Sequence, residues 1–136
     1  MFSTEFMVTE LWKLPEPSSA RVRVDFSQPG GRTCLLTCLF EPDGSDGYRV
    51  TFEGVESYRA TFDTACTVEM IRAAYDRIVD LGATSWLDEV AVRLSQRSAD
   101  KSGLQHLMIY FDDGPCYEFV CRSFSAGPIA AASHTP

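Results

Sequence analysis

The sequence predicts an α+β domain in which one antiparallel sheet of about six to seven strands carries two consecutive helices on one face. Three observations predict this class. Short segments of alternating apolar and polar residues fill the first half of the chain, two segments of helical period follow, and a hairpin pattern comes last. The expected order is therefore four or five strands, then two helices, then two strands.

The first half of the chain has the pattern of strands separated by turns. Five segments share it: residues 5–14, 21–26, 33–40, 48–52 and 57–62. Residues 33–40 are almost continuously apolar, which is typical of a central strand covered on both faces. The other segments alternate apolar and polar residues, so one face of each strand should be exposed to solvent. Gly54 separates the last two segments and indicates either a tight turn or a bulge.

Two helices should follow directly. Residues 67–81 place apolar side chains on one helical stripe, with Thr67 as the N-cap and Gly82 ending the helix. The second helix should begin at Thr84 or Ser85 and run toward Gln96. Both helices are expected to cover the same face of the sheet.

The last patterned segment is Leu104–Phe124, where two apolar, aromatic-rich runs flank Asp112-Asp113-Gly114-Pro115. Glycine accepts positive φ and proline cannot donate to a ladder, so these residues predict the turn of a β-hairpin. Residues 125–136 are small and unpatterned, which predicts a disordered tail. We therefore expect one domain over residues 1–124.

Charge and cysteine content limit the class of function. The net charge of −7 and the pI of 4.7 argue against nucleic acid and anionic membranes as partners, and suit a basic protein partner. The amino-terminal segment lacks a signal-peptide pattern, and no stretch is long and apolar enough for a membrane span, so a cytoplasmic protein is expected. The five cysteines should then be free, mostly buried thiols.

No combination of residues predicts a reaction centre. His106 and Cys121 would face each other if Phe111 paired with Cys116, yet the paired spacing of metal ligands is missing. Cys66 precedes a helix but has no clear imidazole partner. Aspartate is common in β-turns, so the turn explains Asp112 and Asp113 without an acid–base or cation-binding role. We predict no catalytic residue, no metal and no cofactor.

A binding surface is the remaining prediction. The final hairpin combines aromatic rings with carboxylates, a mixture suited to gripping a basic protein. The predicted contact residues are Tyr110, Asp112, Asp113, Tyr117 and Glu118, together with Asp43 and Asp46 from the polar loop at residues 41–47. The alternative is that these aromatics are cross-strand core pairs and that the acids are merely solvated.

In size, acidity and layout, residues 5–124 resemble the small immunity proteins that accompany bacterial polymorphic or contact-dependent toxins. The resemblance implies a non-enzymatic protein that neutralises a toxin domain by binding it. Two alternatives stay open. One is a small-molecule or metal site between helices and sheet, around His106, Cys116 and Cys121. The other is a homodimer formed through an exposed sheet edge.

Overall fold

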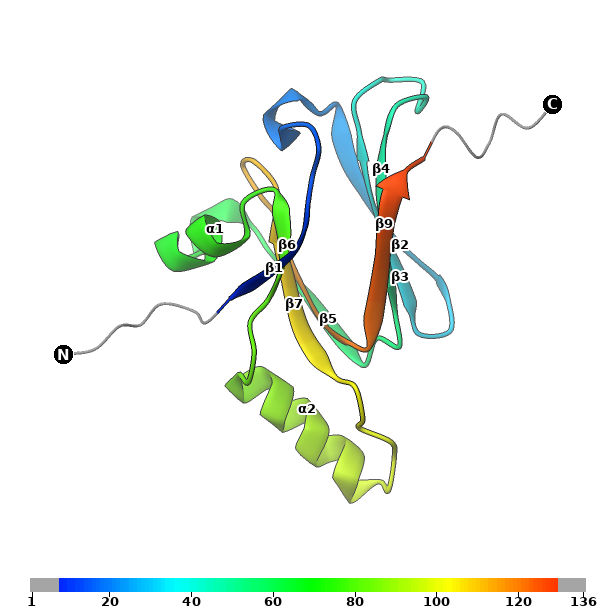
Figure 1. The fold of residues 1–136 in the computed structure, drawn as a ribbon, viewed down its shortest axis with the longest axis vertical. Coiled ribbons are helices and arrows are strands. Elements are labelled where there is room, and N and C mark those ends of the chain that lie inside the picture. Colours follow the sequence, from blue (N-terminus) through cyan, green and yellow to red (C-terminus); the bar gives the residue numbers. More distant parts are fainter. Residues whose placement is uncertain (1–7, 130–136) are drawn as a thin grey trace.

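The computed structural model describes residues 8–129 as two antiparallel sheets packed face to face, with both α-helices on the outer side of one sheet (Figure 1). Nine strands and two α-helices form within these residues. The predicted α+β class is confirmed. The prediction of a single sheet is wrong, because the apolar segments divide between two sheets that bury their inner faces against each other.

The strands are distributed between a five-stranded sheet A, of order β1-β6-β7-β8-β5, and a four-stranded sheet B, of order β2-β3-β4-β9. Sheet A contains β1 (Thr9–Lys13), β5 (Ser57–Thr61), β6 (Arg77–Asp80), β7 (Gln105–Tyr110) and β8 (Cys116–Cys121). Sheet B contains β2 (Arg23–Gly30), β3 (Thr33–Leu39), β4 (Gly47–Glu53) and β9 (Ser123–Pro128). All five strands expected in the first half of the chain form, and residues 5–7 of the first expected strand lie outside the described residues.

Two segments of the chain cross from one sheet to the other at a common corner. β4 continues through residues 54–56 into β5, and β8 continues through Arg122 into β9. The two segments stay paired around the bend, since Arg122 N donates to Glu53 O at 3.0 Å and Glu56 N donates to Val120 O at 2.8 Å. Gly54 makes the bend with φ 65°, so its break in the pattern is a turn between sheets.

The main core lies between the two sheets. Phe52 of β4 and Phe119 of β8 are both fully buried there, and their rings stack with centroids 3.9 Å apart. Fully burying a side chain of this size stabilises the fold by about 1.5–3 kcal/mol. The other buried members of this core are Leu14, Cys34, Leu36, Cys38, Val50, Val55, Ile78, Leu107, Ile109, Phe111 and Cys121.

Both α-helices cover the outer face of sheet A, as Figure 1 shows. The short helix α1 (Val68–Ala74) starts at Thr67, whose hydroxyl accepts a hydrogen bond from Met70 N at 3.1 Å. The longer helix α2 (Ser85–Gln96) starts at Thr84, as predicted. Within residues 8–129, neither helix has the length and apolar character needed to cross a bilayer.

The first helix is shorter than predicted. It stops at Ala74, because Asp76 is buried with φ 57° and cannot continue a right-handed helix. Residues 77–80, which were expected to be helical, form β6 between β1 and β7. The two helices are therefore separated by a strand, and Gly82 follows that strand and not a helix.

The final hairpin forms with a register that differs by one residue from the expected one. Tyr110 pairs with Cys116, and His106 pairs with Val120, because the turn spans residues 111–115. A shift of one residue moves every side chain of a strand to the other face. Cys121 therefore lies in the core between the sheets, whereas His106 lies under α2.

The end of the domain also differs from the prediction. Residues 123–128, of which 125–128 were assigned to a disordered tail, form β9 and pair with β4. They add an antiparallel edge strand to sheet B, with Phe124 packed against the core. Residues 130–136 of the predicted tail lie outside the described residues.

Candidate functional site

One end of sheet A combines exposed apolar side chains with carboxylates. The turn between β7 and β8 meets the connector after β5, which contains a short 3₁₀ helix (Asp63–Ala65), and the helix α1. We call this the tip surface, formed by Phe62, Asp63, Val68, Tyr75, Asp112 and Asp113. Its apolar side chains are exposed, at 74% for Phe62, 58% for Val68 and 40% for Tyr75, and Phe62 is the most exposed large apolar side chain in the described residues.

A close backbone contact joins the turn to the connector. The turn residues Asp113 and Gly114 have φ 63° and 73°, and Gly114 N donates to Phe111 O at 2.6 Å. Gly114 is buried so tightly that a Cβ there would lie 2.9 Å from Asp63 N. Glycine at this position therefore permits both the turn and its contact with the connector. The connector at Asp63 and the turn at Asp113 therefore lie side by side in the tip surface.

Tyr75 fixes the side chain of Asp112. Its hydroxyl donates a hydrogen bond to Asp112 Oδ1 at 2.6 Å. This bond, followed by partial burial, raises the pKa of Tyr75 to about 12. The phenol therefore stays protonated at neutral pH and keeps donating its hydrogen bond to the Asp112 carboxylate.

A buried network supports the turn from beneath. Ser18 donates from its backbone N–H to Asp76 Oδ2 at 3.0 Å, and its hydroxyl donates to Asp76 Oδ1. The same hydroxyl accepts a hydrogen bond from Asp112 N at 2.7 Å. Asp76 O also accepts from Leu14 N at 2.8 Å. The buried carboxylate thus ties the chain before β2 to the turn and holds the tip surface in one conformation.

The tip surface carries concentrated negative charge. Within residues 8–129, no arginine, lysine or histidine forms an ion pair with Asp63, Asp112 or Asp113. The negative charge also affects the nearby Tyr110 hydroxyl. Burial raises the pKa of Tyr110, and the Cys66 thiol and these three carboxylates raise it further. A basic group would therefore be attracted to this end of the sheet.

The structure brings together only part of the predicted binding surface. Asp112 and Asp113 belong to the tip surface, but Tyr110 and Glu118 are buried, at 4% and 3% exposure, and are not accessible to a partner. Tyr117 is half-buried and stacks on Phe26 between the sheets, with ring centroids 5.8 Å apart. These side chains are buried because alternate residues of β7 and β8 face either the inter-sheet core or the two helices.

The acidic loop at residues 41–47 belongs to a different sheet. It joins β3 to β4 in sheet B, so Asp43 and Asp46 do not extend the tip surface. Asp43 accepts a hydrogen bond from Ser45 N at 2.9 Å, and hydrogen bonding with Ser45 lowers the pKa of Asp43. Asp43 therefore stabilises its own loop and remains exposed to solvent.

A second polar cluster is buried under the start of α2. His106 Nε2 lies 2.8 Å from Glu118 Oε1, and His106 Nδ1 lies 2.7 Å from Thr84 Oγ1. Arg59 forms a bidentate ion pair with Glu118, in which Nε donates to Oε2 at 3.0 Å and Nη2 donates to Oε1 at 3.1 Å. The Arg59 guanidinium also lies 4.1 Å from the centre of the Trp86 ring, whose edge packs on His106. This cluster fastens α2 to sheet A.

The electrostatics of the cluster favour an ionised Glu118. Burial by itself would raise the pKa of this carboxyl, but hydrogen bonds from His106 and Arg59 outweigh burial and lower the pKa. Both ring nitrogens of His106 have partners, and Thr84 Oγ1 also accepts from Leu87 N at 3.2 Å. These contacts bind the first turn of α2 to β7 and β8 of sheet A, which is a structural role.

The alternative site around His106, Cys116 and Cys121 does not form. Cys121 is on the inner face of sheet A, and the other two side chains are on its outer face. Within residues 8–129, no three His, Cys, Asp or Glu side chains gather as metal ligands would. All five cysteines are free, and burial raises the pKa of each, to about 12 for Cys121 and about 11 for Cys38. None has the lowered pKa of a nucleophilic thiol.

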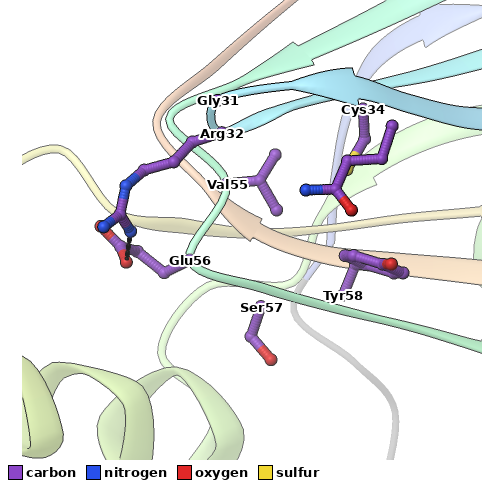
Figure 2. A pocket seen from close by; sticks show the side chains of 8 residues that line it. Gly31, Arg32, Cys34, Val55, Glu56, Ser57 and Tyr58 are labelled. Carbon is purple, nitrogen blue, oxygen red and sulfur yellow. Dashed lines mark hydrogen bonds and ion pairs between the residues drawn. The ribbon is translucent and has the colours of Figure 1, made fainter.

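A surface hollow of about 370 Å³ opens beside the edge of β5, between it and the β2–β3 hairpin (Figure 2). Cys34 and Val55 form its apolar base, and the Tyr58 ring forms one wall. An ion pair between Arg32 and Glu56 borders the opposite side. The size is at the lower end of ligand-binding pockets, which are about 300–1,000 Å³.

The exposed apolar residues of the tip surface were not predicted from the sequence. Phe62 follows β5 by one residue, and Tyr75 follows α1 by one residue, so each continues the apolar pattern of its element. Whether these two side chains are exposed depends on where each element ends, and the sequence pattern does not determine the ends.

Comparisons of the chain with known protein families, curated proteins and solved structures found no match.

Proposed function

We propose that this protein is a non-enzymatic binding module that holds a basic protein partner on the tip surface. One observation carries the proposal: apolar side chains as exposed as Phe62 and Val68 lie among carboxylates that have no ion-pair partner in residues 8–129. Apolar anchors surrounded by charge are the composition of protein interfaces. Carboxylates at the edge of such an interface speed the encounter with a basic partner.

The conformation of the tip surface supports the same proposal. The Asp76–Ser18–Asp112 network and the Tyr75 hydrogen bond hold the turn in place before any partner arrives. A surface that is already ordered loses little conformational entropy on binding, so more of the contact energy appears as affinity. Rigid anchors of this kind suit a protein whose action is to remain bound.

The chemical class of partner follows from the resemblance to immunity proteins of bacterial toxin systems. A basic toxin domain, such as one that attacks nucleic acid, would match the charge of the tip surface. In this proposal the protein blocks the toxin by covering its surface and catalyses nothing. It would act in the cytoplasm, the compartment in which free cysteines such as these five are usual.

Charge reversal on the tip surface tests the proposal. The tagged chain and an Asp63→Lys/Asp113→Lys variant are used to capture partners from the native cell, and the captured proteins are compared by quantitative mass spectrometry. A basic protein should be enriched by the natural chain and reduced at least about tenfold by the variant, since each reversed rim charge costs of the order of 1 kcal/mol. If that protein is a toxin, co-expression should relieve growth arrest only with the natural chain.

The matched control is Glu41→Lys/Asp43→Lys, which changes the net charge equally in an exposed loop of sheet B. This control should retain the partner. Equal loss in both variants would show that only net charge matters. Undiminished capture by the Asp63→Lys/Asp113→Lys variant would remove the tip surface from the interface, and the proposal would fail.

A further inference from the structure

The free edge of β5 differs from the other sheet edges. Edge strands usually carry a device that prevents pairing with another chain. β1 has a register shift after Glu10, β2 has Pro29 and a shift near its end, and β9 ends at Pro128. β5 has neither proline nor a shift, and it pairs with β8 without interruption from Ser57 to Thr61. In the described part of the chain, no strand pairs with its other side.

The surroundings of this edge leave room for an extended segment. Tyr58, Arg59 and Ala60 in the middle of β5 are all exposed. The hollow beside Ser57 and Tyr58 has Cys34 and Val55 at its base, and the rest of its lining is mostly polar, as Figure 2 shows for Arg32, Glu56 and Ser57. Side chains of a strand alternate between faces, so a strand beside β5 could direct one of them into this hollow. Its volume of about 370 Å³ suffices for a large apolar side chain.

The two ends of the edge carry opposite charge. Arg32, paired with Glu56, lies beside the beginning of β5, since Val55 N donates to Arg32 O at 2.9 Å. Glu56 is shared with Arg122, so two guanidiniums face one carboxylate there. The other end leads directly into Phe62 and Asp63 of the tip surface. A segment with basic residues at one end would therefore be aligned by charge and would continue onto the tip surface.

We propose that an extended segment of the basic partner adds to β5 as a further strand of sheet A. Backbone hydrogen bonds hold it, one apolar side chain enters the hollow, and its basic end lies beside Asp63 and Asp113. This inference rests on the proposed function and names how the partner binds. A second copy of the chain fits less well. Two-fold antiparallel pairing of β5 with itself over its full length, centred on its middle residue, would place Arg59 directly opposite its counterpart, and like charges in that position are destabilising.

A peptide library provides a defined probe. Random twelve-residue peptides displayed on phage are selected against the full chain, and the enriched sequences are synthesised. The expected peptides alternate apolar β-branched or aromatic residues and carry lysine or arginine at one end. Enrichment of no sequence, or of sequences without alternation, would overturn the proposal.

Backbone methylation of the selected peptide then separates strand addition from side-chain docking. The backbone amides of a strand point alternately toward and away from its neighbour, so only every second amide of the peptide would bond to β5. Methylating that set should weaken binding at least tenfold, and methylating the other set should leave binding unchanged. An equal loss of binding for the two methylated peptides would overturn strand addition. Hydrogen exchange offers a second readout: amides of β5 should become protected on peptide binding, and unchanged exchange would contradict the proposal.

The two proposals fail in different ways. A partner that depends on Asp63 and Asp113 but leaves the exchange of β5 unchanged would refute strand addition and keep the binding function. Insensitivity of partner capture to these aspartates would refute the function itself. Sedimentation of the chain alone adds one further outcome. Self-association that protects the β5 amides would show that a second copy, and not a partner segment, occupies the edge.

Discussion

The His106 ring and the Glu118 carboxylate meet beneath α2, where Nε2 of the histidine lies 2.8 Å from Oε1 of the glutamate. Both side chains are buried, and Arg59 supplies the positive charge that balances the carboxylate. Breaking a buried pair by removing one partner is strongly destabilising, because the remaining polar groups lose their compensation. The contact therefore predicts a measurable dependence of stability on Glu118.

Glu118→Gln should lower the free energy of unfolding at neutral pH by roughly 1.5–3 kcal/mol, the usual contribution of hydrogen bonds to a charged group. The natural carboxyl has a lowered pKa in the folded protein, so its stabilising effect is complete above its unfolded pKa of about 4.3 and is lost as the pH falls through the lower folded value. Stability should therefore fall less steeply from about pH 5 to pH 3 in the variant. Urea denaturation at several pH values measures this slope.

An exposed carboxylate provides the comparison for Glu118. Asp25 pairs with Arg23 on the surface of β2, where both side chains are about half exposed. Asp25→Asn should keep the natural pH slope, because exposed ion pairs contribute little. If Glu118→Gln has the same slope as the natural protein, the buried contact does not stabilise the folded state.

Asp76→Ala should destabilise the fold by about 2–4 kcal/mol, since it removes two acceptors for Ser18 and places alanine at positive φ. Asp76→Asn should cost clearly less, because asparagine tolerates positive φ and keeps one side-chain oxygen. Thermal or urea unfolding of the two variants gives the comparison. Equal losses would mean that neither the backbone conformation nor the retained oxygen matters.

Gly47→Ala should destabilise sheet B by at least about 1 kcal/mol, the range for overpacking a well-packed site. An added methyl group would clash with the carbonyl oxygen of Cys38 and lie 3.1 Å from the Leu39 backbone. Gly127 of β9 is the control, as a methyl there would meet nothing within 4 Å. Gly127→Ala should be neutral or slightly stabilising by urea denaturation, and a larger loss at Gly127 than at Gly47 would contradict the described packing.

Phe52→Ala should lower the free energy of unfolding by about 3–5 kcal/mol, the usual loss for a buried phenylalanine. It removes the ring that stacks on Phe119 in the centre of the inter-sheet core. Phe62→Ala, at a side chain 74% exposed, should change stability by less than about 0.5 kcal/mol. Calorimetry distinguishes the two. A large loss at Phe62 would mean that this residue packs internally, which would also weaken its role as a binding anchor.

Local pattern predicted most of the elements of this fold but not their division into two sheets. Strand patterns and turn residues located the first five strands and the final hairpin, and helical periodicity located α2. The corner at Gly54 is the point at which β4 and β5 enter different sheets, and a single glycine has the same pattern in a hairpin turn, a bulge or a change of sheet. Pairing between distant strands, such as β4 with β9, has no local signal at all.

The segment around Asp76 shows a second reason for error. Helical periodicity continued through Ile78, but the carboxylate of Asp76 finds its hydrogen-bond partners in Ser18, far away in the sequence. Tertiary contacts thus override helix propensity. The binding surface was predicted in part for a similar reason. The turn placed Asp112 and Asp113 correctly at the surface, while burial of Glu118 depended on Arg59, its cross-strand neighbour on β5.

The late position of β9 has a consequence for synthesis on the ribosome. Sheet B lacks its fourth strand, and the core beneath it lacks Phe124, until the last strand has emerged and reached β4. Until β9 arrives, the free edge of β4 stays unpaired and is open to pairing with another chain. Folds dominated by such distant pairings form in milliseconds to seconds, so cellular chaperones have time to bind this one before it closes.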